Sequence, residues 1–138
     1  MNIYSYHGIR PIIKPSAYVH PQAVIIGNVE IGEEVYVGPN AVIRGDWGKI
    51  IVKDGANVQE NCTLHVFPGI ETILEESAHI GHGAIIHSGH IGKNCLVGMN
   101  SVVMDKAVIG DECIIGALAF VPANFRCEPR KLIVRSEE

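Results

Sequence analysis

The chain has 138 residues, and at about 100–200 residues per domain we expect a single domain over residues 1–138. Its 11 Lys and Arg against 15 Asp and Glu give a net charge of −4, which argues against a nucleic-acid-binding protein, because such proteins carry a basic face. No apolar run approaches the ~18 residues of a membrane span, and the N-terminus lacks the pattern of a signal peptide. We therefore expect a cytoplasmic protein that binds neither nucleic acid nor membranes.

From residue 13 onward an aliphatic side chain recurs with a six-residue period that is interrupted at a few places. The longest unbroken runs are Val19, Ile25, Ile31, Val37 and Ile43, and then Ile91, Val97, Val103, Ile109, Ile115 and Val121. Neither a helix nor an alternating strand has a six-residue period, whereas hexapeptide repeats are typical of a parallel β-helix in which three hexads close one coil. Sixteen to seventeen hexads predict an all-β protein of a little over five coils over residues 13–121, with a short N-terminal extension and a C-terminal tail over 122–138.

The four cysteines are interpreted from the same register. Cys62, Cys95 and Cys113 occupy the fifth position of a hexad, where a small inward side chain is expected. A buried free thiol behaves as a small hydrophobe, so we assign these three a structural role. Cys127 follows the last predicted hexad and receives no role.

The six-residue period breaks at three places. Extra residues are inserted at 44–48 and 67–71, and one residue is missing between Ile86 and Ile91. Insertions in a solenoid bulge outward and often mark the binding face. Counting three hexads per coil stacks Ile43, Leu64 and Ile86, and the outward residues that follow them are Arg44, His65 and His87.

His65 and His87 are therefore expected to be neighbours on one outer column. His82 lies on an adjoining face, and only a neighbouring chain in a three-fold trimer brings it to the other two histidines. Three imidazoles with an open fourth position are typical of a catalytic zinc site. The alternative is that these histidines are surface or capping residues. Four more histidines fit no column and are expected to be structural or solvated, namely His7, His20, His79 and His90.

Polar residues close to this column have candidate roles. Gln59 is expected to hydrogen-bond a metal-bound hydroxide, with Asn57 orienting it. Arg44 and Asp46 are interpreted as an ion pair between subunits or an anchor for bicarbonate, and the alternative is a structural ion pair of little energetic weight.

These motifs resemble the γ-class carbonic anhydrase-like proteins, and most closely the branch of the phenylacetic acid degradation and carnitine-operon proteins. The resemblance covers residues 1 to about 125. It is carried by Arg44-Gly45-Asp46, by Asn57-Val-Gln59-Glu-Asn61-Cys-Thr-Leu-His65 and by Gly81-His82-Gly-Ala-Ile-Ile-His87.

The resemblance implies a left-handed parallel β-helix and a homotrimer with a zinc or iron ion at each subunit interface. By motif, the metal ligands are His65, His82 and His87, and the interface ion pair is Arg44 with Asp46. The implied activity is that of a zinc-dependent lyase, in which a metal-bound hydroxide attacks carbon dioxide to give bicarbonate.

Two departures from the family pattern bear on this activity. The acidic loop that carries the family's glutamate proton shuttle is replaced by the short segment 66–72, in which Glu71 is the obvious candidate, and Trp47 follows Asp46 where the family has a glutamate. The C-terminal helices of relatives are also missing, so we expect either a truncated protein or a trimer held by the prisms alone.

Three other functions stay open at this point. An acyl-CoA thioesterase of the phenylacetate type would use the same metal site. A hexapeptide acyltransferase would bind acyl-CoA between chains and use one histidine as a general base without metal. A non-catalytic scaffold would retain the histidines without using them.

Overall fold

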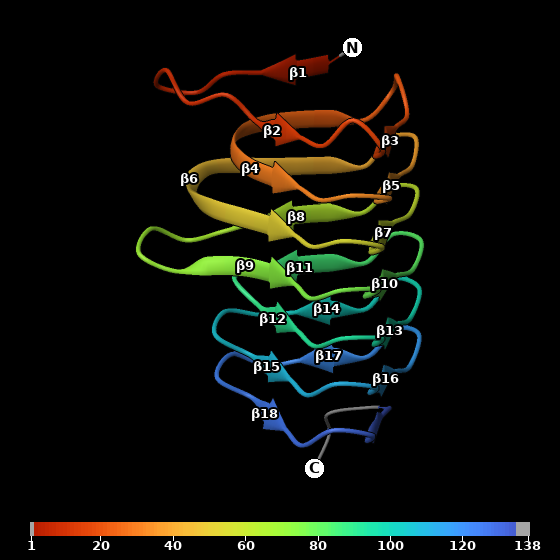
Figure 1. The fold of residues 1–138 in the computed structure, drawn as a ribbon. Coiled ribbons are helices and arrows are strands. Elements are labelled where there is room, and N and C mark those ends of the chain that lie inside the picture. Colours follow the sequence, from red (N-terminus) through yellow and green to blue (C-terminus); the bar gives the residue numbers. More distant parts are fainter. Residues whose placement is uncertain (1, 135–138) are drawn as a thin grey trace.

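The computed structural model describes residues 2–134, and these residues wind into a left-handed β-helix built from short parallel strands (Figure 1). The strands are β1 Asn2–Tyr4, β2 Ile12–Ile13, β3 Tyr18–Val19, β4 Val24–Ile31, β5 Tyr36–Val37, β6 Val42–Val52, β7 Asn57–Val58, β8 Thr63–His65, β9 Glu71–Leu74, β10 His79–Ile80, β11 Ile85–His87, β12 His90–Ile91, β13 Leu96–Val97, β14 Val102–Val103, β15 Val108–Ile109, β16 Ile114–Ile115, β17 Phe120–Val121, β18 Arg126–Cys127 and β19 Leu132–Ile133. The prediction of an all-β parallel helix is confirmed.

The strands stack into three faces of a prism. One face is a seven-stranded sheet in the order β3-β5-β7-β10-β13-β16-β19, with one strand from each coil. The other two faces share a twelve-stranded sheet, because the long strands β4 and β6 turn the corner and pair with strands on both faces. The predicted stack is confirmed, since Ile43 pairs with Leu64 and Leu64 with Ile86.

The number of coils was underestimated from the sequence. The seven-stranded face shows seven coils, whereas the hexad count predicts a little over five. The repeat continues past Val121, because Cys127 pairs with Ile109 and Ile133 with Ile115. Cys127 therefore belongs to the last coil and not to a tail. Residues 135–138 of the predicted tail lie outside the described residues.

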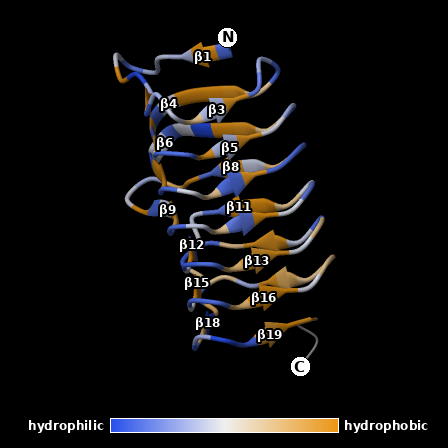
Figure 2. Cartoon of the chain, turned by 45° about the vertical axis from the view of Figure 1, so that its right-hand side comes forward, coloured by the Kyte–Doolittle hydropathy of each residue, from blue (hydrophilic) through white to orange (hydrophobic). Residues whose placement is uncertain are grey.

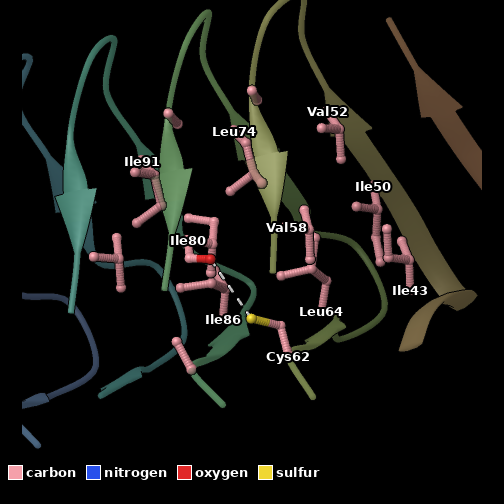
Figure 3. Close-up of a cluster of buried hydrophobic side chains, with 14 of the residues drawn as sticks. Ile43, Ile50, Val52, Val58, Cys62, Leu64, Leu74, Ile80, Ile86 and Ile91 are labelled. Carbon is pink, nitrogen blue, oxygen red and sulfur yellow. Dashed lines mark hydrogen bonds between the residues drawn. The ribbon is translucent and has the colours of Figure 1, made fainter. Parts of the chain in front are cut away.

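The core is one cluster of aliphatic side chains that point inward from the three faces along the prism axis. Figure 3 shows several of them, among them Leu64, Ile80 and Ile86, and each is completely buried. The fifth-position residues are buried beside them, and the Cys62 thiol donates a hydrogen bond to the carbonyl of Gly81 at 3.0 Å. The structural role predicted for Cys62, Cys95 and Cys113 fits their burial.

Close backbone packing explains one pair of glycines at the first insertion. Gly27 has φ +78°, and a Cβ atom there would lie 2.5 Å from the carbonyl oxygen of Gly45. Strand β4 faces β6 at this point, where the register between them shifts after Gly27. The insertion at 44–48 is therefore absorbed inside a continuous strand β6, as a bulge.

The second insertion forms a loop that projects from the prism between β8 and β9 (Figure 1). Ile70 closes it with a backbone hydrogen bond to the carbonyl of Phe67 at 3.3 Å. Two buried hydroxyls hold its ends. The Thr72 hydroxyl donates to the carbonyl of His65 at 2.6 Å, and the Ser88 hydroxyl accepts from the amide of Phe67 at 2.7 Å. Because Thr72 also accepts from the Ser88 amide at 2.9 Å, this network fixes the chain next to His65 and His87.

The outer surface of the seven-stranded face changes character along the prism. Its outward column runs from Asn57 and His79 to Leu96, Ile114 and Leu132, which are 41%, 46% and 65% exposed. Figure 2 shows the strands β13, β16 and β19 as a hydrophobic stretch toward the C-terminal end. Within residues 2–134 no helix is long and apolar enough to cross a membrane.

Candidate functional site

Two histidines meet at the ends of neighbouring strands. His65 ends β8 and His87 ends β11, and the register pairs them directly. Nδ1 of His65 lies 3.2 Å from Nε2 of His87, and the ring centroids are 5.1 Å apart. His65 is 7% exposed, whereas the His87 side chain is 24% exposed. The sequence prediction that these two histidines share an outer column is confirmed.

A carboxylate holds the far nitrogen of each ring. Asp46 Oδ1 lies 2.9 Å from Nε2 of His65, and Asp105 Oδ1 lies 2.6 Å from Nδ1 of His87. Each carboxylate accepts a hydrogen bond, so the proton of each neutral imidazole sits on the nitrogen that faces the carboxylate. The two nitrogens that face each other are then both left with lone pairs.

Asp46 is further fixed by an ion pair with Arg44 within the same chain. Burial by itself would raise the pKa of Asp46, but hydrogen bonds from Arg44 and His65 outweigh burial and hold that pKa below its usual range. The carboxylate is therefore ionised at neutral pH. The expected role of this pair between subunits stays a prediction, while within one chain Asp46 acts on His65.

The two facing ring nitrogens are better placed to share a metal ion than to form a hydrogen bond with each other. Two lone pairs 3.2 Å apart repel each other unless a proton or another cation lies between them. Ligand nitrogens at 2.0–2.1 Å from a tetrahedral zinc ion are about 3.3–3.4 Å apart, which is close to the separation observed. Carboxylates bound to the far nitrogens of metal-ligating histidines are also a common feature of such sites.

A single chain does not complete a three-histidine set. Among the described residues no group of three or more His, Cys, Asp or Glu side chains is placed to hold a metal ion. His82 lies in the turn between β10 and β11, where its Nδ1 is 3.2 Å from Glu60 Oε1 and its side chain is 53% exposed. Its assignment as a ligand from a neighbouring chain stays a prediction.

Two aromatic rings flank the histidine pair. The ring centroids of Trp47 and His65 are 5.4 Å apart, and those of Phe67 and His87 are 5.7 Å apart. Trp47 and Phe67 also face each other at 6.0 Å, and they are 51% and 47% exposed. Both lie in inserted segments, so the two insertions bring an apolar surface beside the histidines.

Asn57, Gln59 and His79 form a second polar cluster on the seven-stranded face. His79 Nδ1 lies 2.9 Å from Asn57 Nδ2, and His79 Nε2 lies 2.6 Å from Gln59 Nε2. The expectation that His79 fits no column is wrong, because the register pairs it with Asn57, and it is wrong for His90 too, which pairs with Ile73. The cluster is separate from His65 and His87 within one chain, because β7 and β10 belong to a different face.

The other predicted residues have simpler surroundings. Glu71 is exposed and makes no hydrogen bond to any described histidine, so its role as a proton acceptor stays a prediction. His20 accepts a hydrogen bond from the backbone of Gln22 at 3.0 Å, and His90 contacts Glu75 at 2.6 Å. Asp105 was missed by the sequence reasoning. The only sequence signal for Asp105 is its position in the coil that follows His87. It lies one residue beyond the position that the register places opposite His87.

Comparisons with a family model and with known proteins both match this chain to hexapeptide-repeat proteins. The family model described as bacterial transferase hexapeptide (six repeats) matches residues 10–45 and 90–123. The carnitine operon protein CaiE of Proteus sp. (strain LE138) is 51% identical over 136 residues, which cover 99% of this chain and 69% of that protein. CaiE of Escherichia coli (strain K12 / DH10B) is 52% identical over 134 residues, which cover 97% of this chain and 68% of that protein.

Two solved structures share the fold over nearly the whole chain. A Bacillus cereus protein proposed to be an acetyltransferase has a TM-score of 0.93 and 41% identity, and the match covers 96% of this chain and 78% of that one. A hexapeptide transferase family protein from Anaplasma phagocytophilum has a TM-score of 0.92 and 32% identity, with the same coverage.

Proposed function

Since this chain belongs to the hexapeptide-repeat family that includes the carnitine operon proteins CaiE, we propose that it is a metal-dependent enzyme whose active site forms between two chains of a trimer. His65 and His87 of one chain and His82 of the partner subunit would hold a zinc or ferrous ion. One observation carries this proposal. The ring nitrogens of His65 and His87 converge at 3.2 Å while carboxylates occupy their far nitrogens.

The trimer is supported by the surface around His82. His82 is exposed and its only hydrogen-bond partner among the described residues is Glu60, so its Nε2 is available to a neighbouring chain. The outward side chains of the next coils on that face include Leu96 and Ile114, which are apolar and exposed. A closed three-fold arrangement would bury this face against the face of the neighbour that carries His65 and His87.

The residues of this chain would prepare the site for hydration of carbon dioxide. A divalent cation bound by three imidazoles would supply a hydroxide nucleophile near neutral pH. Asp46 and Asp105 hold the two histidines in the tautomer that presents a lone pair, and Arg44 keeps Asp46 ionised. Gln59 would offer its amide to the bound substrate, and Asn57, which contacts Gln59 at 3.2 Å, would orient it. Formation of bicarbonate from carbon dioxide and water releases one proton, for which Glu71 is the proposed acceptor.

A specific observation favours a second substrate class for the same site. Carbon dioxide needs little apolar surface, yet Trp47 and Phe67 place two half-exposed rings beside His65 and His87. Such a surface suits the acyl chain of an acyl-CoA thioester, which the same nucleophile would hydrolyse. Acyl transfer without a metal is the third candidate, and it is supported by the acetyltransferase proposed for the Bacillus cereus relative.

The deciding experiment is the metal content of protein purified without oxygen, followed by activity assays. We expect about one zinc or iron per chain in a trimeric protein. His82→Ala should lose this metal, whereas His20→Ala should keep it, because the His20 ring accepts a hydrogen bond from the amide of Gln22 and is no part of the proposed site. Full metal content in the His82→Ala protein, or a metal-free wild-type trimer, would overturn the proposed site.

The assays then separate the substrates. Stopped-flow carbon dioxide hydration and thioester hydrolysis should both depend on bound metal if the site is hydrolytic. Transfer of an acyl group to an amine or alcohol in protein freed of metal would instead support the acyltransferase.

A further inference from the structure

Three side chains on the seven-stranded face form a closed ring of contacts. Asn57 and Gln59 come from β7 and the residue after it, and His79 comes from β10 directly beside it. The polar atoms of His79 and Asn57 are 2.9 Å apart, those of His79 and Gln59 are 2.6 Å apart, and those of Gln59 and Asn57 are 3.2 Å apart. All three distances are those of hydrogen bonds, so each contact needs one hydrogen atom between its two partners.

The way the amides are shared limits how these hydrogens can be arranged. Asn57 uses one end of its amide toward His79 and the other end toward Gln59. Gln59 uses a single amide atom for both of its contacts. The oxygen and nitrogen of an amide have nearly the same shape, so the hydrogen-bond network decides which is which.

Only two arrangements give Asn57 and Gln59 a proper hydrogen bond to each other. In the first, both amides direct NH2 groups at His79, and both ring nitrogens would have to accept. An imidazole cannot do this, because a neutral ring always carries a hydrogen on one nitrogen. In the second, both amides direct oxygen atoms at His79, and both ring nitrogens donate. This arrangement requires the doubly protonated imidazolium.

We propose that His79 is a positioning residue that is held as an imidazolium and fixes the orientation of the Gln59 amide. In this state Gln59 Oε1 accepts hydrogen bonds from His79 and Asn57, and Gln59 Nε2 turns out of the ring toward the face that would meet a neighbouring chain. No hydrogen bond among the described residues uses this outer amide atom. The group that Gln59 offers is therefore a hydrogen-bond donor.

Within residues 2–134 no charged side chain near this ring of contacts holds the cation on His79, so the two amides hold it. On one side β7 and the residue that follows it present Asn57 and Gln59, and on the other side β13 presents the apolar Leu96 opposite His79. The carboxylate that follows Gln59 in the chain, Glu60, contacts His82 instead. The cation on His79 is therefore held by two amide oxygens, and loss of either one leaves a ring nitrogen without its acceptor.

This inference rests on the proposed function, because the outer donor gains its use at the site between chains. There it would stabilise negative charge on a substrate oxygen during attack, which is the task of an oxyanion-hole donor. Removing one such donor costs about 10²–10³ in kcat in other enzymes. The positioning role and the metal site can nevertheless be tested separately.

The first test uses ring 15N and 1H NMR of the histidines in metal-free trimer at pH 7, where no activity is needed. We expect two ring N–H groups on His79 in the wild type and in Gln59→Glu, whose carboxylate still accepts from both neighbours. We expect one ring N–H on His79 in Gln59→Leu. His20 serves as the internal reference, because its Nδ1 accepts a backbone hydrogen bond and therefore carries no hydrogen. A single N–H on His79 in the wild type would overturn the proposal.

The second test uses the metal-loaded enzyme. Gln59→Glu keeps the ring but removes the donor, so we expect kcat to fall by about 10²-fold at an unchanged metal content. His79→Leu removes the ring, so kcat should fall with little change in KM. Wild-type kcat in Gln59→Glu would contradict the donor role. If His79 were doubly protonated in a trimer that binds no metal, the proposed function would be refuted. The positioning role of His79 would still stand.

Discussion

Asp105 Oδ1 lies 2.6 Å from Nδ1 of His87, and Asp46 makes the equivalent contact with His65 at 2.9 Å. The two carboxylates stand on opposite outer sides of the histidine pair, so the nitrogens between them are both left as acceptors. A pair of histidines built only for surface solvation needs neither carboxylate. The arrangement is therefore the part of the chain that argues most strongly for a bound cation.

Asp105→Asn should weaken metal binding by about 10- to 100-fold, because the ligand His87 loses the charge that fixes its tautomer and raises its basicity. The dissociation constant can be measured by competition with a chelator of known affinity. Asp111→Asn is the matched control, because its side-chain oxygen caps the backbone of Lys93 at 2.8 Å and an amide oxygen can do the same. Equal affinity in Asp105→Asn and wild type would contradict a role for Asp105.

The histidine column could be predicted because three hexads close one coil, whatever residues an insertion adds between them. An inward Leu64 and an inward Ile86 necessarily place His65 beside His87. Asp105 could not be predicted in the same way. Its contact with His87 depends on a side chain reaching across from the next coil, which a count of residues does not describe.

The two hexads beyond Val121 were missed for a related reason. Phe125 stands at the fifth position, where other hexads have a small residue, and Cys127 stands where they have an aliphatic residue. Both are only partly buried, because the last coil is covered from one side only. The hexad pattern is weaker at the end of the prism because these partly buried positions accept side chains that the fully buried core would not.

Leu64→Ala should lower the free energy of unfolding by about 2–5 kcal/mol, because Leu64 is completely buried between Ile43 and Ile86 and its loss leaves a cavity (Figure 3). Ile86→Val in the same column should cost only about 0.5–1.5 kcal/mol. Urea unfolding at one fixed protein concentration measures both, since assembly makes stability depend on concentration. If Leu64→Ala were no more costly than Ile86→Val, the core would be able to collapse around the lost side chain.

Glu75 makes the stability of the prism sensitive to acid. Burial by itself would raise the pKa of Glu75, but hydrogen bonds from Lys53 at 2.9 Å and His90 at 2.6 Å hold that pKa below its usual range. The unfolded chain therefore binds this proton more readily than the folded chain. The contribution of Glu75 is complete above the unfolded pKa, near 4.5, and is lost as the pH falls through the lower folded pKa.

The measurement is the urea midpoint of the wild type and of Glu75→Gln across the acid range. The wild type should be more stable than Glu75→Gln at pH 7, and the difference should shrink below about pH 4. Glu128→Gln, at an exposed position, should follow the wild type throughout. A difference that grew toward low pH would have the wrong sign for a lowered pKa.

The buried thiols of Cys62 and Cys95 should be nearly inert in the folded protein. Burial raises the pKa of both thiols to about 11, and each donates a hydrogen bond to a glycine carbonyl at 3.0 Å. The thiolate is the reactive form, so at pH 8 only about one molecule in a thousand would carry it at either position. A disulfide reagent should therefore modify these two thiols at the rate of unfolding.

The variant Cys62→Ala/Cys95→Ala separates them from the other two thiols. Compared with the wild type, it should have two fewer slowly reacting thiols in native buffer. After denaturation in urea it should have two fewer thiols in total. Cys113 and Cys127 lie 3.5 Å apart near the open end of the prism and are unchanged in this variant. Fast modification of Cys62 in the wild type would mean that the middle coils open without global unfolding. Such opening would be incompatible with a rigid column beneath His65 and His87.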